Sequence, residues 1–187
     1  ELFESLRTAA LEAHAAVLAE AAARTAASGR PEAKRMATTL TLALAVWPVM
    51  YVVQVGDSRC YHYFDGVLRQ VTRDQTLAQD LVDKGVLPRD RVAASGFSNV
   101  LASAIGGSEA TPEVTRLAIP RGCVVLLCSD GLTKHVSDPE IAERIGVMES
   151  SEQLCRTLLD LALERGGTDN ITVLAGRARG SSMQTAA

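Results

Sequence analysis

The sequence lacks the paired cysteines that a zinc site would need. Its four cysteines never form a CxxC motif; they are Cys60, Cys123, Cys128 and Cys155. Cys123 and Cys128 occupy positions of opposite parity, so in one strand they would point to opposite faces. A zinc site is therefore not expected. We expect buried free thiols in a reducing, cytoplasmic compartment.

Long hydrophobic runs and a large net charge are also absent. The longest mainly apolar run, Leu40 to Val55, is shorter than the roughly 20 residues that span a bilayer, and Pro48 lies in its middle. We interpret this run as two strands joined at Trp47-Pro48. The net charge of -3 gives no general attraction to nucleic acid or anionic lipid. Neither nucleic acid nor a membrane is expected as a partner.

An initiator methionine and the basic start of a signal peptide are missing as well. The chain begins Glu1-Leu2-Phe3-Glu4, which predicts no signal peptide and suggests that the natural start lies upstream. No internal repeat or low-complexity block stands out. With 187 residues and 47% hydrophobic content, the chain is long enough for one domain with a proper core and short for two.

What the sequence does contain is a buried-strand pattern that ends at a carboxylate. Residues 123–128 are apolar without interruption, and Ser129-Asp130-Gly131 follows. Such a strand is buried on both faces, and an ionised Asp130 at its end is costly unless a cation, hydrogen-bond donors or a metal neutralises it. Two interpretations are open at this point. Asp130 is a metal ligand, or it caps a helix that starts near Thr133.

A second carboxylate, Asp169, stands at the edge of another strand pattern. Residues 166–170, Gly-Gly-Thr-Asp-Asn, separate a helical pattern from the strand-like Ile171 to Ala175. Asp130 and Asp169 can meet if their two strands are neighbours in one sheet. Hard oxygen ligands of this type suit Mg²⁺ or Mn²⁺ better than zinc. The two aspartates are therefore candidate ligands of a divalent ion.

The remaining pattern predicts a mixture of helices and strands. An Ala-rich, amphipathic helix is expected over residues 3–27, and a capping box at Ser137 and Glu140 predicts a helix that runs to about Ile145. Further helices are expected over residues 75–84 and from Ser150 or Ser151 to Gly166, with a loop or flap over residues 87–98. Strands are expected over residues 38–46, 49–55, 60–64, 67–71 and 113–119.

The first four of these strands follow one another with only turns between them, which predicts an antiparallel meander. The fold class is therefore α+β, with an antiparallel sheet core and helical cover. Consecutive strands without intervening helices argue against parallel crossovers. They also argue against a doubly wound α/β domain with Asp130 as a phospho-accepting nucleophile. A haloacid-dehalogenase-type site of that kind needs a second Asp two residues on, where Leu132 stands.

Six motifs in order give the chain a resemblance to a known family. They are Thr38-Thr39-Leu40, Gly56-Asp57-Ser58-Arg59, Thr72-Arg73-Asp74, Leu101 to Gly106, Cys128 to Leu132 and Gly167 to Val173. With these motifs, the chain resembles the metal-dependent Ser/Thr protein phosphatases of type 2C, the PPM family, from about Leu2 to Ala178. The resemblance implies one N-terminally truncated domain over residues 1–178 and a flexible tail over residues 179–187. It also implies an antiparallel β-sandwich flanked by helices, with metal ions at one end.

The resemblance implies metal-dependent hydrolysis of phosphoserine and phosphothreonine in proteins by a metal-activated water. The implied partners are a phosphoprotein substrate and a Ser/Thr kinase or its targets. The complete domain would hold two Mg²⁺ or Mn²⁺ ions, or three. By position, Asp130 and Asp169 match the family's late metal ligands. Asp74 matches an acid that, in bacterial members, helps to hold a third, weaker metal. No residue is assigned as catalytic, although His135 can be tested as a proton donor.

Several features depart from the family pattern. The two motifs that the family carries upstream of its long helix, with a phosphate-binding Arg and an Asp that bridges both metals, are not in this chain. Their strands are missing with them, so an incomplete sheet with an exposed edge is expected. Ala37 and Gln75 replace a Gly and a His of the family. Asp57 and Arg59 are expected to stabilise a turn near the site.

Lys134 is a further departure, because many relatives have an acidic residue there. At i+4 spacing Lys134 would face Asp130 and compete with a cation for it. With few carboxylates left, a low Mg²⁺ affinity is expected for this chain by itself. The alternative function is therefore a catalytically inactive phosphatase-like domain that binds a phosphoprotein or a regulatory partner.

Overall fold

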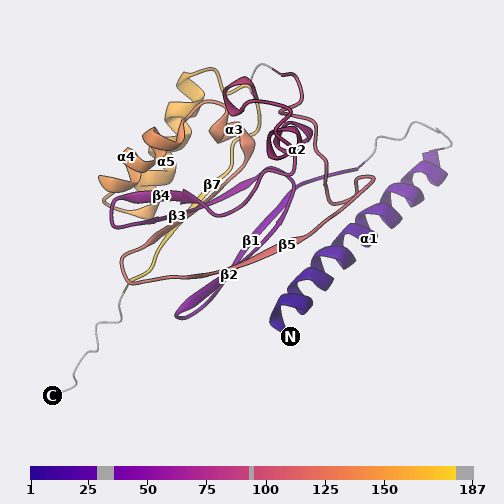
Figure 1. Cartoon of the computed structure of the whole chain (residues 1–187). Helices are drawn as coiled ribbons and strands as arrows, with labels where there is room; N and C mark the ends of the chain where they lie inside the picture. Colours follow the sequence, from indigo (N-terminus) through magenta and orange to yellow (C-terminus); the bar gives the residue numbers. More distant parts are fainter. Residues whose placement is uncertain (29–35, 93–94, 180–187) are drawn as a thin grey trace. The chain divides into compact units, whose positions relative to one another are not determined.

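The computed structural model describes residues 1–28, 36–92 and 95–179 (Figure 1). Its helices are α1 (Leu2–Ser28), α2 (Leu77–Asp83), α3 (Asp130–Thr133), α4 (Asp138–Gly146) and α5 (Ser151–Glu164), with a 3-10 turn at Arg89–Arg91. Its strands are β1 (Leu40–Val46), β2 (Val49–Val55), β3 (Arg59–Phe64), β4 (Val67–Gln70), β5 (Glu113–Ala118), β6 (Val124–Cys128) and β7 (Val173–Arg177). This mixture of helices and antiparallel strands confirms the α+β class. None of the described helices has the length and apolar character needed to cross a bilayer.

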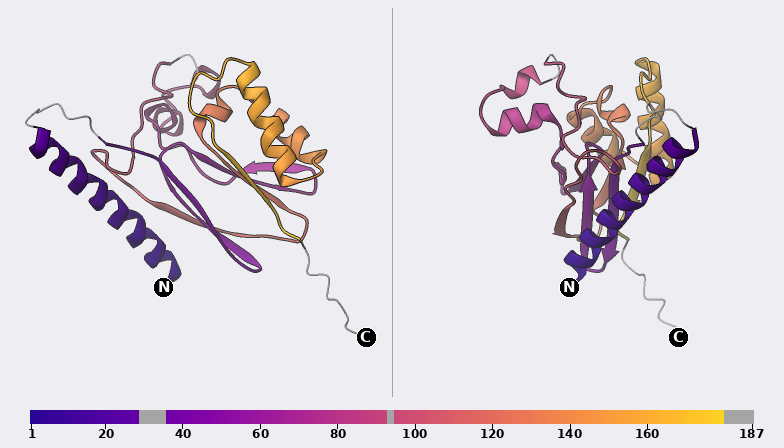
Figure 2. Two further views of the ribbon diagram at one scale, coloured as in Figure 1. Left: turned by 180° about the vertical axis from the view of Figure 1, so that it is seen from behind. Right: turned by 90° about the vertical axis from the view of Figure 1, so that its right-hand side faces the viewer.

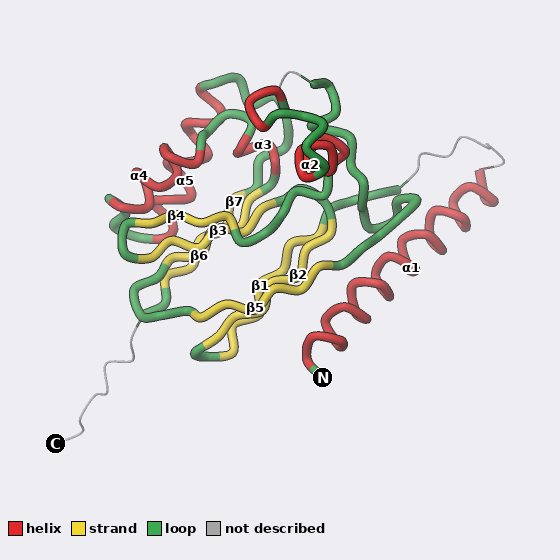
Figure 3. The backbone as a smooth tube through the Cα atoms, in the orientation of Figure 1, coloured by secondary structure: helices red, strands yellow, loops and turns green. Residues whose placement is uncertain are grey.

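The chain divides into two compact units. One comprises Glu1–Leu44, Tyr51–Ser58 and Thr72–Arg116, and the other comprises Ala45–Met50, Arg59–Val71 and the segment from Leu117 onward. The first contains α1, α2 and most of a sheet with the order β1-β2-β5, and the second contains a sheet with the order β4-β3-β6-β7 and helices α3 to α5 (Figure 3). The tail predicted over residues 179–187 lies outside the described residues except for its first residue.

In the second unit, β6 lies between β3 and β7 and pairs antiparallel with both. Leu126 is in register with Tyr61 on one side and with Ala175 on the other. Alternate residues of β6 are fully buried, whereas Val125 and Leu127 between them are half-buried. Complete burial on both faces, as the apolar run predicts, is thus reached on one face only.

Helices α3, α4 and α5 pack on the fully buried face, and α5 lies beside β7 in each view (Figures 1 and 2). The core between sheet and helices includes Tyr61, Val124, Leu126, Leu132, Ile141, Leu154 and Leu158. α4 begins with the predicted capping box of Ser137 and Glu140. Ser150 is the N-cap of α5, and its side chain accepts the N–H of Gln153. Both helix starts are confirmed, because each depends on a cap of adjacent residues.

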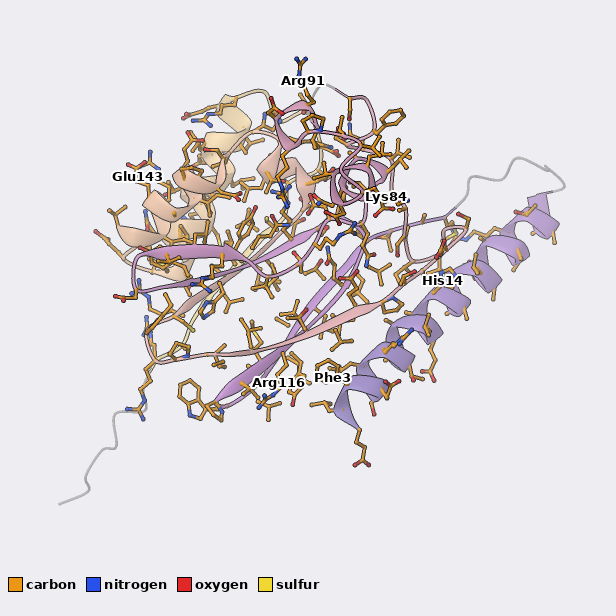
Figure 4. All side chains as sticks on the ribbon, viewed as in Figure 1. Phe3, His14, Lys84, Arg91, Arg116 and Glu143 are labelled. Atoms are coloured by element: carbon orange, nitrogen blue, oxygen red, sulfur yellow. The ribbon has the colours of Figure 1, made fainter. Side chains whose placement is uncertain are left out.

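In the first unit, α1 is shielded along one narrow stripe. The less exposed positions recur every three or four residues and are Leu6, Ala10, His14, Val17, Ala21 and Thr25. The ring of Phe3 packs edge-on against Tyr51 of β2, with 5.6 Å between centroids, and Nδ1 of His14 accepts the N–H of Gly106 at 3.0 Å (Figure 4). Larger apolar side chains lie off the stripe, since Leu11 is 40% and Leu18 is 42% exposed. The helix is therefore less cleanly amphipathic than predicted.

The prediction that the first four strands form one antiparallel meander is wrong. β1 and β2 are neighbours, but β3 and β4 belong to the other sheet. The chain leaves β2 at Gly56, which has a φ of 108°, and a Cβ at Gly56 would lie 2.4 Å from Cγ2 of Thr39. Glycine is needed for both reasons. An alternating apolar pattern identifies a strand but does not name its partner, and this is why the sequence prediction failed.

Two smaller predictions concern the burial of the cysteines and an exposed sheet edge. Cys60, Cys123 and Cys128 are buried free thiols as expected, but Cys155 is only half-buried. It lies on α5, which is a surface helix with one buried stripe. β7 is an end strand of its sheet, and its Leu174 is 58% exposed. That a missing strand accounts for this edge stays a prediction.

Candidate functional site

The candidate site lies where β6 ends and β7 begins, in the second unit. Just beyond β6, the hydroxyl of Ser129 donates to the carbonyl of Asn170 at 2.9 Å and accepts the N–H of Thr172 at 3.0 Å. The N–H of Ser129 also donates to the carbonyl of Thr172 at 3.1 Å. These bonds of Ser129 continue the contact between the two strand segments beyond Cys128 and Val173, the last paired residues of β6 and β7. The strands before Asp130 and after Asp169 are neighbours in one sheet, which is the condition that the sequence analysis set for the two aspartates to meet.

Gly131 allows the loop that carries Asp169 to lie against the start of α3. A Cβ at Gly131 would come within 2.4 Å of the carbonyl oxygen of Asn170, so any larger residue must displace backbone. Gly131 is buried in the first turn of α3. The sequence therefore brings the two aspartates together by close backbone contact as well as by strand pairing.

Lys134 connects the two carboxylates. Its Nζ lies 2.6 Å from Oδ2 of Asp130 and 2.7 Å from Oδ2 of Asp169. Lys134 follows α3 directly, so the i+4 spacing returns its side chain over Asp130, as predicted. The contact with Asp169 was not predicted. The three side chains are 30–41% exposed, so a solute could reach this cluster of two acids and one base.

Charge pairing changes the proton affinities in this cluster. The pKa of Asp169 is lowered, mainly by the hydrogen bond from Lys134 and then by the backbone N–H of Asn170. Partial burial acts to lower the pKa of Lys134, but hydrogen bonds to Asp130 and Asp169 outweigh it and raise that pKa above the usual value. The ammonium form of Lys134 and the carboxylate form of Asp169 therefore stabilise each other.

A second set of contacts holds the Asp169 loop from the other side. Nε2 of His135 accepts the N–H of Thr168 at 3.1 Å and lies 2.9 Å from the Thr168 hydroxyl. Arg165 donates to the carbonyl of His135 at 2.6 Å and pairs with Glu140 of the capping box. Because Nε2 accepts a backbone N–H, His135 positions this loop. No sequence pattern predicts these contacts, since their partners are 25 to 33 residues apart.

Asp74 lies in the first unit, before α2. The residues on either side of it, Arg73 and Gln75, make contacts that hold the first unit together. Arg73 donates to Asp80 at 2.7 Å and to Asp83 at 2.6 Å on α2. Buried Gln75 accepts the N–H of Gly56 and donates to the carbonyl of Thr111, both at 2.9 Å. In the described parts of the chain, no three or more His, Cys, Asp or Glu side chains gather as a ready metal site. The role of Asp74 at a third ion stays a prediction.

Arg59 makes a contact that the sequence did not predict. Its Nη1 donates to the hydroxyl of Tyr61 at 2.9 Å, and that hydroxyl donates to Oδ1 of Asp138 at 2.8 Å. Asp138 is the first residue of α4, where a negative charge is favourable. Arg59 thereby ties β3 to the helix that follows the candidate site.

Comparison with known proteins agrees with this arrangement. A sequence model described as Protein phosphatase 2C matches residues 2–165. The serine/threonine protein phosphatase PstP of Mycobacterium tuberculosis is 39% identical over 144 residues, covering 77% of this chain and 28% of PstP. The serine/threonine phosphatase stp of Listeria monocytogenes is 34% identical over 141 residues, covering 74% of this chain and 56% of that protein. The chain thus spans only part of these relatives.

Solved structures give the same result. The crystal structure of M. tuberculosis PstP superposes with a TM-score of 0.78 and 34% identity, covering 89% of this chain and 68% of that one. The PstP catalytic domain in complex with two manganese ions gives a TM-score of 0.80 and 33% identity, over 96% of this chain and 73% of that one. Since the family match covers nearly the whole sequence and the fold agrees with it, the chain belongs to the protein phosphatase 2C family.

Proposed function

We propose that this chain takes part in metal-dependent hydrolysis of phosphoserine and phosphothreonine in proteins. Family membership supports the reaction class. The observation that carries the proposal is the convergence of Asp130, after β6, and Asp169, before β7, on one cationic group. Mg²⁺ is commonly held by one or two carboxylates with waters in its other positions, so two carboxylates that share one cation fit such an ion.

The donor chemistry fits Mg²⁺ or Mn²⁺. Carboxylate oxygens are hard ligands, and the Lys134 ammonium marks a position that both side chains reach at once. Asp130 and Asp169 would hold the ion, with Asp74 at a third, weaker ion. A bound ion would supply Lewis acidity and lower the pKa of a coordinated water. The related PstP domain was solved with two manganese ions, which supports the choice of metal.

The residues around the aspartates have defined tasks in this proposal. Ser129 and Gly131 fix the distance between the β6 end and the Asp169 loop through the contacts to Asn170. His135 holds the same loop through Thr168. These contacts keep the two carboxylates in place, which matters because Mg²⁺ relies on near-ideal ligand geometry. The substrate would be a cytoplasmic phosphoprotein, and a Ser/Thr kinase or its targets would be the partners.

The test is Mn²⁺-dependent release of phosphate from a phosphothreonine peptide. The chain is assayed alone and together with its natural upstream sequence. Asp130→Asn should lower kcat by about 100-fold or more in the active form, because it removes a charged ligand. Asp160→Asn, at an exposed position of α5, is the matched control and should leave kcat unchanged.

Two results would contradict the proposal. One is an absence of Mn²⁺-dependent activity in both forms of the protein. The other is equal activity of Asp130→Asn and Asp160→Asn. Tight binding of the phosphopeptide without any metal, measured by calorimetry on an inactive protein, would instead identify a phosphoprotein-binding domain.

A further inference from the structure

We infer that the Lys134 ammonium is the resident counter-ion of the Asp130–Asp169 pair, and that a divalent ion binds there only by displacing it. This inference rests on the metal site of the proposed function. It adds that one side chain of the protein sets the metal affinity of the site. Lys134 would compete with the ion for the same carboxylates, so the ion concentration that the site needs would depend on the residue at position 134.

The geometry places ammonium and metal at the same oxygens. Nζ contacts Oδ2 of Asp130 at 2.6 Å and Oδ2 of Asp169 at 2.7 Å, so both contacts are short, charge-assisted hydrogen bonds. A divalent ion held by both carboxylates would need oxygen atoms at about 2.1 Å. An ammonium and an ion of charge two cannot occupy that space together, because they would repel each other at close range.

The charge balance also favours competition over simple coexistence. Two carboxylates carry two negative charges, and Lys134 neutralises one of them. The ammonium of Lys134 contacts an oxygen of Asp130 at 2.6 Å and an oxygen of Asp169 at 2.7 Å, so its single positive charge is shared between the two acids. A divalent ion entering the site therefore meets a pair that is already half neutralised.

The size of the effect follows from competition between two states. If the ion binds only when Lys134 has swung away, its apparent Kd is the intrinsic Kd divided by the fraction of molecules in which the lysine is displaced. A closed form favoured by about tenfold would weaken apparent binding by about tenfold. Lys134 is 30% exposed, so its long side chain has solvent into which to move.

The same contacts assemble the site before any ion arrives. Lys134 joins the end of α3 to Asp169, and the adjacent His135 joins the same turn to Thr168. The ligands are thus held near each other by a cation of the protein itself. Removing that cation by substitution of Lys134 leaves two neighbouring carboxylates unneutralised. A bound metal ion should therefore stabilise the fold of such a variant more than it stabilises the natural sequence.

The experiment measures Mn²⁺ binding directly, by electron paramagnetic resonance of the free ion. The proteins are the natural sequence, Lys134→Met, Lys134→Arg and the matched control Lys84→Met, which removes a lysine from an exposed position at the end of α2 (Figure 4). Lys134→Met should bind Mn²⁺ at least tenfold more tightly. Lys134→Arg retains the charge and should stay close to the natural affinity, and Lys84→Met should not change it.

Two further measurements assign the effect to this site. Adding Asp130→Asn to Lys134→Met should abolish the gain in Mn²⁺ affinity. The rise in Tm on adding Mn²⁺ should be larger for Lys134→Met than for the natural sequence. If Lys134→Met does not fold, Lys134→Gln is used, because it is neutral and keeps a hydrogen-bonding end.

The outcomes separate this inference from the proposed function. Equal Mn²⁺ affinity of the natural sequence and Lys134→Met would overturn the inference, even if the protein is an active Mn²⁺-dependent phosphatase. If the natural sequence is inactive both alone and with its upstream sequence, the function is contradicted, and tighter Mn²⁺ binding by Lys134→Met would still support the inference. An equal gain in Lys84→Met would also overturn it, because the effect would then be one of net charge.

Discussion

Aspartates form ion pairs with a basic side chain in two regions of this protein, and the two sets of ion pairs have different structural consequences. In the second unit, Asp130 meets Asp169 through Lys134, and the two acids come from segments far apart in the sequence. In the first unit, Arg73 beside Asp74 pairs with two acids of one short helix, Asp80 and Asp83. The first arrangement joins distant strands at one exposed point, whereas the second fastens a helix to the turn before it.

The difference indicates which acids are available for chemistry. A carboxylate pair assembled from distant segments depends on the pairing of β6 with β7. In the part of the chain that the structure describes, the cation that bridges it is a lysine, whose long stem rotates freely. Asp80 and Asp83 are held by a planar guanidinium with several fixed donors, which is harder to displace. Acids of the second kind stabilise local structure, and the comparison predicts that their region affects stability more than metal binding.

The largest expected effect tests the acids of the two regions against each other. Asp169→Asn should lower Mn²⁺-dependent kcat by about 100-fold or more, because it removes a charged ligand and the partner of Lys134. Asp74→Asn should cost about tenfold or less at saturating Mn²⁺, because a third, weaker ion is the only role predicted for it. The measurement is hydrolysis of a phosphothreonine peptide in the active form of the protein. Equal losses in the two variants would break the comparison.

The next effect concerns stability in the first unit. Gln75 is 4% exposed, and its amide satisfies the N–H of Gly56 and the carbonyl of Thr111. Gln75→Ala leaves both backbone groups unpaired and should lower the free energy of unfolding by about 2–4 kcal/mol. Gln79→Ala, which removes an exposed hydrogen bond to Asp83, should change it by about 0.5 kcal/mol or less.

Urea denaturation of the two glutamine variants provides the measurement. The Mn²⁺ affinity of Gln75→Ala should equal that of the natural sequence, since Gln75 contacts backbone groups of its own unit. A variant with normal stability but altered Mn²⁺ affinity would instead place Gln75 in the metal site, and the division between the two regions would no longer hold.

Much of the second unit could be predicted from sequence because its signals are local. The capping box at Ser137 and Glu140 involves residues three apart, and the i+4 contact of Lys134 with Asp130 follows from helix geometry. The uninterrupted apolar run before Asp130 marks the central strand. Each of these depends on residues within one or two turns of each other.

The parts that could not be predicted depend on contacts between distant residues. Lys134 and Asp169 are 35 residues apart, and no periodic pattern links them. The same holds for Arg165 and Glu140, which are 25 residues apart. The false meander had this cause too, because Gly56 directs the chain to a different sheet while the strand pattern on either side of it continues unchanged.

The smallest expected effect is the pH dependence of the Arg165–Glu140 pair. The pKa of Glu140 is lowered far below its ordinary value of 4.5, first by the hydrogen bond from Arg165 and then by Ser137. A carboxyl group with a lowered pKa in the folded state stabilises the fold at pH values above the unfolded pKa. That contribution is lost as pH falls toward the folded pKa. Arg165→Met should therefore lower Tm at pH 7, and its deficit should shrink on acidification below about pH 4.5.

Arg156→Met is the matched control for this experiment. Arg156 pairs with Glu152, but both side chains are 75% exposed, so solvent screens the pair and its loss should change Tm little at any pH. Arg165 also donates to the carbonyl of His135, a group that does not titrate. A deficit in Arg165→Met that is the same at pH 7 and pH 3 would therefore mean that Arg165 acts through His135, on the loop that carries Asp169. In that case Arg165 would belong to the candidate site, and Arg165→Met should weaken Mn²⁺ binding.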